Sequence, residues 1–209
     1  MYKKLEEETI NYLLETGIDE FAEKGLDRAN INHIAKKAGV SVGVIYKYYG
    51  DKDNFFLSCV EHSLKFLEDV IGDVIDSDSD LKRCVRLLIN RLIEGAEKHP
   101  NYYVMYNEIT AGSCRKYAAK LASEIEGKTA NLYAGLIAKG QEEGKVVDSE
   151  NPKIAAFFFD NLLMMLQFAF SCEYYKERFL IFCGEEIVND KEALADAFCA
   201  FVERAIGIR

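Results

Sequence analysis

The chain has 209 residues, of which 49% are hydrophobic and 29% are charged, a balance that suits a globular protein with a sizeable core. Its formal net charge of -9 disfavours a polyanion as the partner of the whole surface, because an acidic surface repels phosphate. Any nucleic-acid site must therefore be local. The two prolines, Pro100 and Pro152, leave long tracts available for helix.

The cysteines are spread along the chain, and no pair has the C-x-x-C spacing of a metal or redox site. The three histidines and the cysteines do not gather into a set of ligands along the sequence, so we expect free, buried thiols in a reducing compartment and no metal centre. The first residues, Met1-Tyr2-Lys3-Lys4, lead into an acidic run and lack the apolar core of a signal peptide. These features predict a cytoplasmic protein.

Apolar residues recur at helical spacing along almost the whole chain, and no segment alternates as a strand would, which predicts an all-α fold. Glycines and capping residues mark the ends of the elements, with Asn30, Ser41 and Asp51 as expected N-caps. A polar break is expected at residues 76–80. The expected helices span residues 7–24, 31–38, 42–48, 52–75, 81–98, 101–111, 115–143, 152–172, 174–182 and 191–206.

This pattern divides the chain near residue 50. Three short helices in residues 1–50 precede a larger helical body in residues 51–209. The run from Ile154 to Cys172 is apolar enough to raise the question of a membrane span, but Asp160, Asn161 and Gln167 interrupt it. We therefore expect a helix buried within protein, and no membrane association.

The segment from Arg28 to Gly50 contains no Asp or Glu, although the protein is acidic. It carries four positive charges, from Arg28, Lys36, Lys37 and Lys47. A helix that lies against phosphates cannot carry carboxylates, since each would repel the backbone that it approaches. This local bias is what a DNA-contacting surface requires, although a solvated helix pair with a chance excess of lysine would also produce it.

The second and third expected helices are joined by a short turn at Gly39, which is typical of a helix-turn-helix. In such a pair the second helix enters the major groove of DNA and the first crosses the backbone. Ile34 and Ile45 are placed to fill the core between the helices. The residues that we expect to face outward are Val42, Gly43, Val44, Lys47 and Tyr48.

The first quarter of the chain resembles the TetR (tetracycline repressor) family over a dense series of motifs. The matching residues are Phe21-Ala22-Glu23-Lys24-Gly25-Leu26, then Ile34-Ala35-Lys36-Lys37-Ala38-Gly39-Val40-Ser41-Val42-Gly43-Val44-Ile45-Tyr46-Lys47-Tyr48-Tyr49, then Asp51-Lys52. Two departures are visible. Ala29 and Asn30 stand where the family usually has two threonines, and Tyr49 replaces the usual phenylalanine.

The resemblance implies roles for individual residues. Tyr46 and Lys52 would contact phosphates, with core packing and plain solvent exposure as their respective alternatives. Ser41 would cap the third helix and offer its amide end to phosphate, and Asn30 could still cap its helix and reach the backbone. Around the groove, the resemblance places Lys47 and Tyr48 at its edge and Val42, Gly43 and Val44 against the bases.

The resemblance also implies that the helical body binds a small molecule and forms a homodimer. We expect a bulky apolar or aromatic effector, because tyrosines at helical spacing bring hydroxyl groups to an apolar wall. The alternative for each of these side chains is ordinary core packing. The candidate lining residues are Tyr102, Tyr103, Tyr106, Asn107, Phe158, Met165 and Phe168.

No catalytic motif, nucleotide-binding glycine loop or cofactor signature is present in the sequence, so we expect neither an enzyme nor a cofactor. The sequence favours a repressor that binds a palindromic operator in double-stranded DNA and is released by its effector. Two other classes remain at this point, a helical small-molecule-binding protein without DNA recognition and a helical enzyme with scattered catalytic residues.

Overall fold

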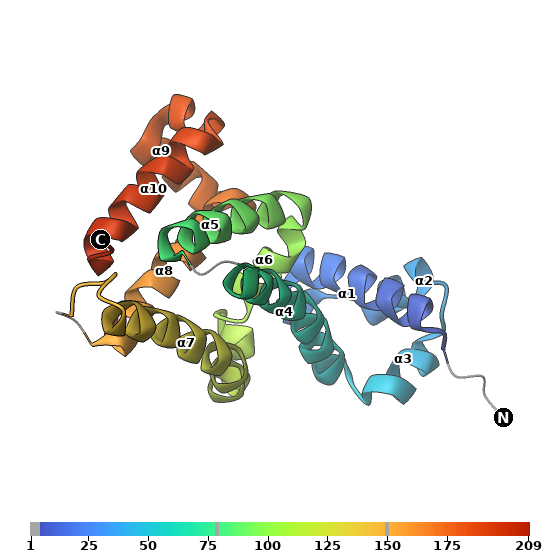
Figure 1. The fold of residues 1–209 in the computed structure, drawn as a ribbon. Helices are drawn as coiled ribbons and strands as arrows, with labels where there is room; N and C mark the ends of the chain where they lie inside the picture. The colour runs from blue at the N-terminus through green and yellow to red at the C-terminus, as the bar shows by residue number, and fades with distance from the viewer. Residues whose placement is uncertain (1–4, 78–79, 149–150) are drawn as a thin grey trace. The chain divides into compact units, whose positions relative to one another are not determined.

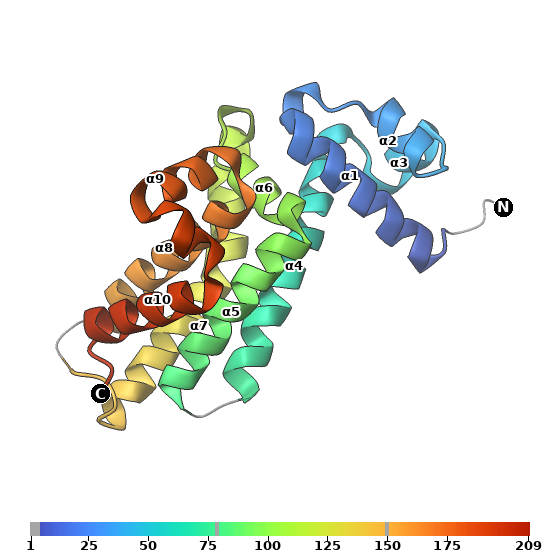
Figure 2. The ribbon, with the colours of Figure 1, turned by 90° about the horizontal axis from the view of Figure 1, so that it is seen from above.

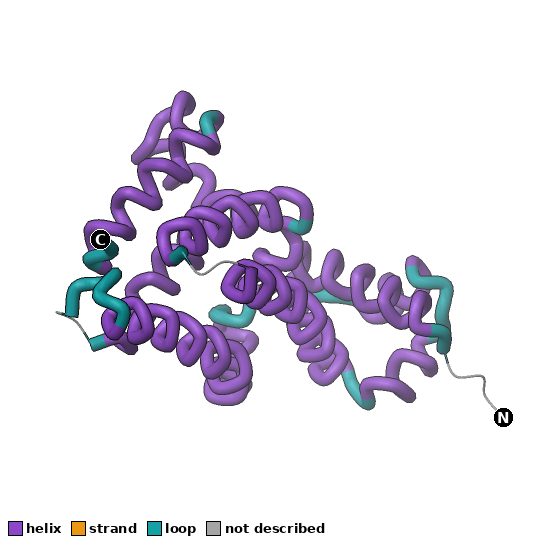
Figure 3. The backbone as a smooth tube through the Cα atoms, in the orientation of Figure 1, coloured by secondary structure: helices purple, strands orange, loops and turns teal. Residues whose placement is uncertain are grey.

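The computed structural model describes residues 5–77, 80–148 and 151–209 (Figure 1), without the side chains of residues 75–77 and 128. Residues 1–4, and part of the expected polar break at 76–80, lie outside this description. The described regular elements are helical, which confirms the all-α prediction (Figure 3). They are α1 (Glu7–Arg28), α2 (Ile31–Lys37), α3 (Val42–Tyr49), α4 (Lys52–Ser77), α5 (Leu81–Lys98), α6 (Pro100–Glu108), η1 (Gly112–Tyr117), α7 (Ala118–Glu142), α8 (Pro152–Ser171), α9 (Glu173–Asn189) and α10 (Lys191–Ile206).

Capping side chains explain why several helices begin where the sequence predicts. The side-chain oxygen of Asn30 accepts a hydrogen bond from the Asn32 N–H, and that of Ser41 accepts one from the Val44 N–H. Asp51 does the same for Asn54 at the start of α4. Each cap satisfies an N–H group that has no partner within the helix itself.

The ends of several elements differ from the expected positions, and α6, for example, ends at Glu108 and not at residue 111. The segment 112–117 forms the 3-10 helix η1, so α7 begins at Ala118 and not at residue 115 as expected. The backbone at Gly25 and Gly184 is not helical, with φ of 72° and 74°, so a helix stops at each glycine as the sequence predicts. The ranges α1 and α9 each include a second helical segment beyond this break, at residues 26–28 and 185–189, and glycine tolerates the positive φ that the break requires.

The chain divides into two compact units. The first unit comprises Met1–Phe66 and Asn101–Ala118, and the second comprises Leu67–Pro100 and Ala119–Arg209. Helix α4 begins in the first unit and ends in the second. The first unit is thus larger than the three-helix domain expected from the sequence, because it includes the start of α4 together with α6 and η1.

The core of the first unit is a cluster of aromatic rings between α1 and α4. The Phe21 ring meets the Phe56 ring edge-on at 5.2 Å between centroids and the Phe55 ring at 5.8 Å. Gly17 permits this close approach, because a Cβ there would lie 2.6 Å from the Cys59 sulfur. Helix α2 packs against α1, and α3 against α2, and Figure 2 draws the three helices together.

In the second unit, α5 packs against α8 and α10, and α9 packs against α8 and α10 (Figure 2). The buried face of α5 supplies much of this core, with Leu88, Ile89 and Leu92 almost fully enclosed. The segment after α10 pairs with the segment after α7 through an antiparallel bridge between Ile208 and Val146. Apolar burial is the main cohesive force in this unit.

By length and composition alone, α8 would suffice to cross a membrane, but core helices of soluble proteins meet the same test. One side of α8 is buried, including Phe159, Leu163 and Leu166. All six cysteines are free, and Cys183 is exposed whereas the other five are buried. Among the described residues, no three His, Cys, Asp or Glu side chains gather as metal ligands would.

Candidate nucleic-acid interface

Helices α2 and α3 form a helix-turn-helix within the first unit. Ile34 and Ala35 of α2 and Ile45 of α3 are buried, as the sequence predicts. The turn between them passes through Gly39, whose φ of 69° belongs to the left-handed region that favours glycine. The Val40 N–H closes the turn by donating to the Ala35 carbonyl at 3.0 Å.

The outer side of α3 consists of residues that can approach DNA without repelling it. Ser41, Gly43 and Lys47 are exposed, while Val42 and Val44 are half-buried. Neither α3 nor its N-cap contains a carboxylate. The outer side of α3 is therefore a surface without carboxylates. With eight residues, α3 is little more than two turns long, so only a short helix could enter a DNA groove.

Tyr46 and Tyr48 are both exposed at the surface. For Tyr46 this removes the alternative of core packing and leaves its hydroxyl accessible to a phosphate. The Tyr48 hydroxyl accepts a hydrogen bond of 2.6 Å from the Leu5 N–H. The beginning of the described chain therefore lies beside the C-terminal turn of α3, a contact for which the sequence gives no signal.

Lys52 and Asn30 have structural partners besides any contact with DNA. The Lys52 ammonium donates to the Asp27 carbonyl oxygen at 2.9 Å, near the end of α1. A lysine in this place counters the partial negative charge of a helix C-terminus. Asn30 is exposed and caps α2, whereas the adjacent Ala29 is buried and out of reach of a phosphate.

Not all the positive charge of the acid-free segment is available to DNA. The Lys37 ammonium donates to an Asp19 carboxylate oxygen at 2.9 Å, and this hydrogen bond raises the pKa of Lys37. Asp19 belongs to α1, outside the segment. Lys36, the residue before Lys37 in α2, is exposed and is a further candidate for phosphate contact.

Glu20 is a buried carboxylate that joins α1 to the start of α2, and it is not among the site residues that the sequence predicts. Its side chain is 7% exposed and accepts hydrogen bonds from the Asn30 N–H at 3.0 Å and from the His33 ring at 2.6 Å. Burial acts to raise the pKa of Glu20, but these two hydrogen bonds outweigh it and the pKa lies below its usual range. Glu20 therefore fixes the N-terminus of α2 against α1, and with it the position of the helix-turn-helix.

Helix α6 and η1 are also tied to this unit by polar contacts. The Tyr102 hydroxyl donates to the Glu15 carboxylate, which also contacts the His62 ring at 2.9 Å. The Lys116 ammonium and the Tyr117 hydroxyl both donate to the Asp53 carboxylate near the start of α4. Sequence patterns give no sign of these pairs, because the partners lie 87, 63 and 64 residues apart.

Glu108, at the end of α6, occupies the break in α1. Its Oε1 accepts hydrogen bonds from the Leu26 N–H at 3.4 Å and from the Ser113 hydroxyl at 3.3 Å. A Cβ at Gly25 would lie 2.8 Å from the same oxygen. Gly25 is thus required twice, for its positive φ and for the space that Glu108 fills.

The predicted effector residues fall in both units. In the first, Tyr103 and Tyr106 are buried, and Tyr102 and Asn107 are half-buried. The Tyr103 hydroxyl is buried without a hydrogen-bond partner among the described residues, and burial raises its pKa.

On α8 in the second unit, Phe168 is buried against the Tyr175 ring, at 5.3 Å between centroids. Phe158 is 62% exposed and Met165 is also exposed. Helix α8 also buries two polar residues, Gln167 and Ser171, neither of which is among the predicted lining residues.

Residues 13–59 match the model of the family described as bacterial regulatory proteins, tetR family. An uncharacterised HTH-type transcriptional regulator of Bacillus subtilis, YvdT, is 31% identical over 93% of each chain. The transcriptional repressor SCO4008 of Streptomyces coelicolor is 30% identical over 66% of this chain and 67% of its own.

Among solved structures, the regulator FadR of Bacillus subtilis in complex with stearoyl-CoA superposes with a TM-score of 0.73 at 16% identity, covering 94% of this chain and 99% of that one. This likeness concerns the fold. Together with the helix-turn-helix geometry and the match to YvdT over nearly its whole length, the comparisons identify the function class. The chain belongs to the tetR family of transcriptional regulators and is not an enzyme.

Proposed function

We propose that this regulator is a cytoplasmic repressor that binds a palindromic operator through α3 and leaves it when a bulky apolar or aromatic effector binds. The observation that carries the proposal is the carboxylate-free outer side of α3, with Tyr46 and Lys47 exposed upon it. Lys36 and the N-cap of α3 extend the same surface toward the DNA backbone. A relative that is named as a repressor supports the direction of control.

The proposed operator is a palindrome because the functional protein is proposed to be a homodimer, the state that is typical of the family. Helix α8 carries an outer row of exposed apolar residues: Ile154, Phe157, Phe158 and Met165. On α10, Phe201 is 51% exposed. Two such helices from each subunit would cover these side chains in a four-helix bundle about a two-fold axis.

Binding to duplexes from the promoter of the gene itself tests the proposal. Affinity for a palindromic site should fall steeply between low and moderate salt, because each phosphate contact releases a counterion. Lys47→Glu should weaken binding by about a hundredfold or more, since it places a carboxylate against the groove. Lys65→Glu, an equal change of charge at an exposed position of α4, is the control. Equal losses in the two variants would contradict docking through α3.

A second measurement separates dimerisation from DNA reading. Phe201→Asp should yield monomers in sedimentation experiments and weaken operator binding, while the helical content remains that of the wild type. The reason is that two half-sites roughly 34–36 Å apart must be read together for full affinity. A wild-type chain that is monomeric at micromolar concentration would remove the palindrome from the proposal.

A further inference from the structure

In the second unit, the inner side of α8 carries two hydrogen-bond acceptors. Asp160 and Gln167 are seven residues apart, so they lie on one face of the helix, about 10 Å apart along its axis. The side chain of Gln167 is 4% exposed, and its carbonyl oxygen Oε1 has no hydrogen-bond partner among the described residues. An acceptor enclosed in this way is destabilising unless a donor reaches it.

Asp160 has no hydrogen-bond donor or cation as a partner in the described part of the chain, and it is half-buried. Burial, and then the negative charge of Glu126 on α7, raises the pKa of Asp160 to about 6. The carboxyl is therefore ionised at neutral pH in surroundings that disfavour its charge. A bound cation would relieve this penalty, whereas a bound anion would increase it.

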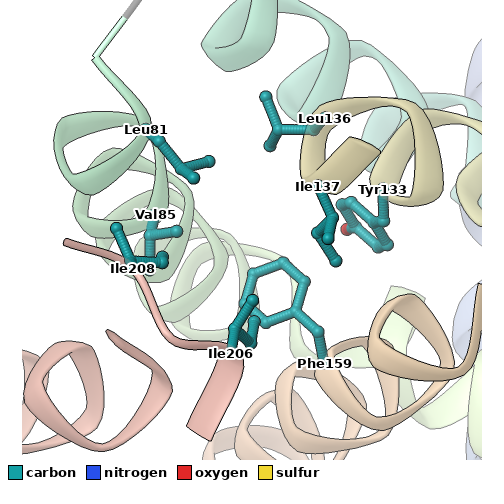
Figure 4. A pocket seen from close by; sticks show the side chains of 8 residues that line it. All are labelled: Leu81, Val85, Tyr133, Leu136, Ile137, Phe159, Ile206 and Ile208. Carbon is teal, nitrogen blue, oxygen red and sulfur yellow. The ribbon is translucent and has the colours of Figure 1, made fainter. Parts of the chain in front are cut away.

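An apolar region adjoins the acidic end of this face. The rings of Tyr133 on α7 and Phe159 on α8 meet edge-on at 5.2 Å between centroids. Burial and the charges of Asp160 and Glu126 raise the pKa of Tyr133, which places this tyrosine within the field of both carboxylates. Tyr133 and Phe159 also border a small cavity of about 10 Å³, which Figure 4 shows to be lined by Leu81, Val85, Tyr133, Leu136, Ile137, Phe159, Ile206 and Ile208.

From this arrangement we infer that the effector is a lipophilic amine. Its apolar body would lie against α7 and α8, and its ammonium group would lie at Asp160. A second hydrogen-bond donor of the effector would lie near Gln167 Oε1, roughly 10 Å away. The inference rests on the proposed function, which supplies the effector. It sets this chain apart from FadR of Bacillus subtilis, whose bound stearoyl-CoA is a polyanion. The acceptors on this face would repel such a ligand.

Four eight-carbon probes of similar length test the charge and the second donor separately. Aminooctanol carries the cation and a hydroxyl, octylamine the cation alone, octanediol two hydroxyls, and hydroxyoctanoate an anion in place of the amine. Their dissociation constants for the full-length protein are measured by calorimetry at pH 7.5, with thermal shifts as a second readout. We expect aminooctanol to bind at least about tenfold more tightly than hydroxyoctanoate, because the Asp160 carboxylate attracts the ammonium group of the first probe and repels the carboxylate of the second.

Variants assign the effect to the residues. Asp160→Asn should abolish the preference for the amine over octanediol. Gln167→Leu, or Gln167→Met if the leucine variant does not fold, should reduce binding of aminooctanol to that of octylamine. Glu177→Gln, which removes an exposed carboxylate from α9, should leave all four constants unchanged. Circular dichroism checks that each variant is folded.

Three results would overturn the inference: hydroxyoctanoate binding as tightly as aminooctanol, no binding of either amine, or an amine preference that survives Asp160→Asn. Operator binding without any probe is measured in parallel. A preference for amines in a protein that binds no DNA would contradict the proposed function alone. Operator binding by a protein that prefers the anion would contradict the effector class alone.

Discussion

Both units of the molecule have an apolar core, but they differ in the polar contacts that accompany it. In the first unit, carboxylates form hydrogen bonds between different elements, as Glu20 does with Asn30 and Glu15 with Tyr102. In the second unit, the elements meet through a continuous apolar core. The charged pairs there, such as Arg86 with Asp196 and Lys191 with Glu97, lie at exposed positions.

This difference matters for a regulator. Contacts made by partly buried charges are directional and respond to a change of charge, pH or position of either partner. An apolar core is insensitive to these variables, and its stability depends on the area and volume that it encloses. In the unit that contains α2 and α3, the contacts of Glu20 are therefore sensitive to the charge of a single side chain. Four substitutions test this contrast, from the largest expected effect to the smallest.

Leu92→Ala should produce the largest loss. Leu92 is fully buried in α5, and removing its side chain leaves a cavity that costs about 2–5 kcal/mol of unfolding free energy. The measurement is urea unfolding followed by circular dichroism at low and high salt, and the loss should be the same at both. Ile181→Ala on α9, where the side chain is 80% exposed, is the control and should change stability by less than about 0.5 kcal/mol.

Glu20→Ala tests the electrostatic anchor of the first unit. The variant leaves the Asn30 N–H without its acceptor, so the protection of α2 amides should fall by about 1–3 kcal/mol in hydrogen exchange at pH 7. The pKa of Glu20 is lowered in the folded protein, so its contribution is present above the usual glutamate range and is lost as the pH falls through the lowered value. Wild type and variant should therefore converge in acid. Glu20→Gln keeps an acceptor without the charge and should lose less.

Asp160→Asn should stabilise the protein. The pKa of this carboxyl is raised from 3.8 to about 6 on folding, so the native state binds the proton more tightly than the unfolded chain does. The free energy of unfolding of the wild type should fall as the pH rises from about 4 to 6, and the variant escapes this penalty. We expect a gain of about 1–2 kcal/mol at pH 7.5 that shrinks as the pH falls and disappears below about pH 3 in urea unfolding. A loss of stability at pH 7.5 would show that Asp160 is favourably partnered.

Arg86→Met should have the smallest effect. Arg86 pairs with Asp196 between α5 and α10, but both side chains are largely exposed and solvent screens their attraction. Unfolding free energy should change by less than about 1 kcal/mol, and added salt should reduce the difference further. A larger loss would mean that charged pairs hold the second unit together too, and the contrast between the units would disappear.

Local chemistry made much of the fold predictable. Asn30, Ser41 and Asp51 act as caps because each side chain bonds an N–H within three residues, so the sequence alone contains both partners. The helical spacing of apolar residues gave α5 and α10 their observed bounds. The acid-free segment also indicated the outer side of α3, because repulsion between like charges excludes carboxylates wherever a helix must approach phosphate.

The tertiary structure decided what local patterns cannot contain. The sequence showed that Glu20 and Glu108 are charged, but only the packing of α1 with α2 and of α6 with α1 turned them into anchors at Asn30 and Leu26. It likewise decided that Phe158 is exposed while Gln167 is enclosed, against their intrinsic polarity. The physical reason is that the burial of a side chain depends on which face of its helix the neighbouring helices cover. That choice is made by contacts between residues far apart in the chain.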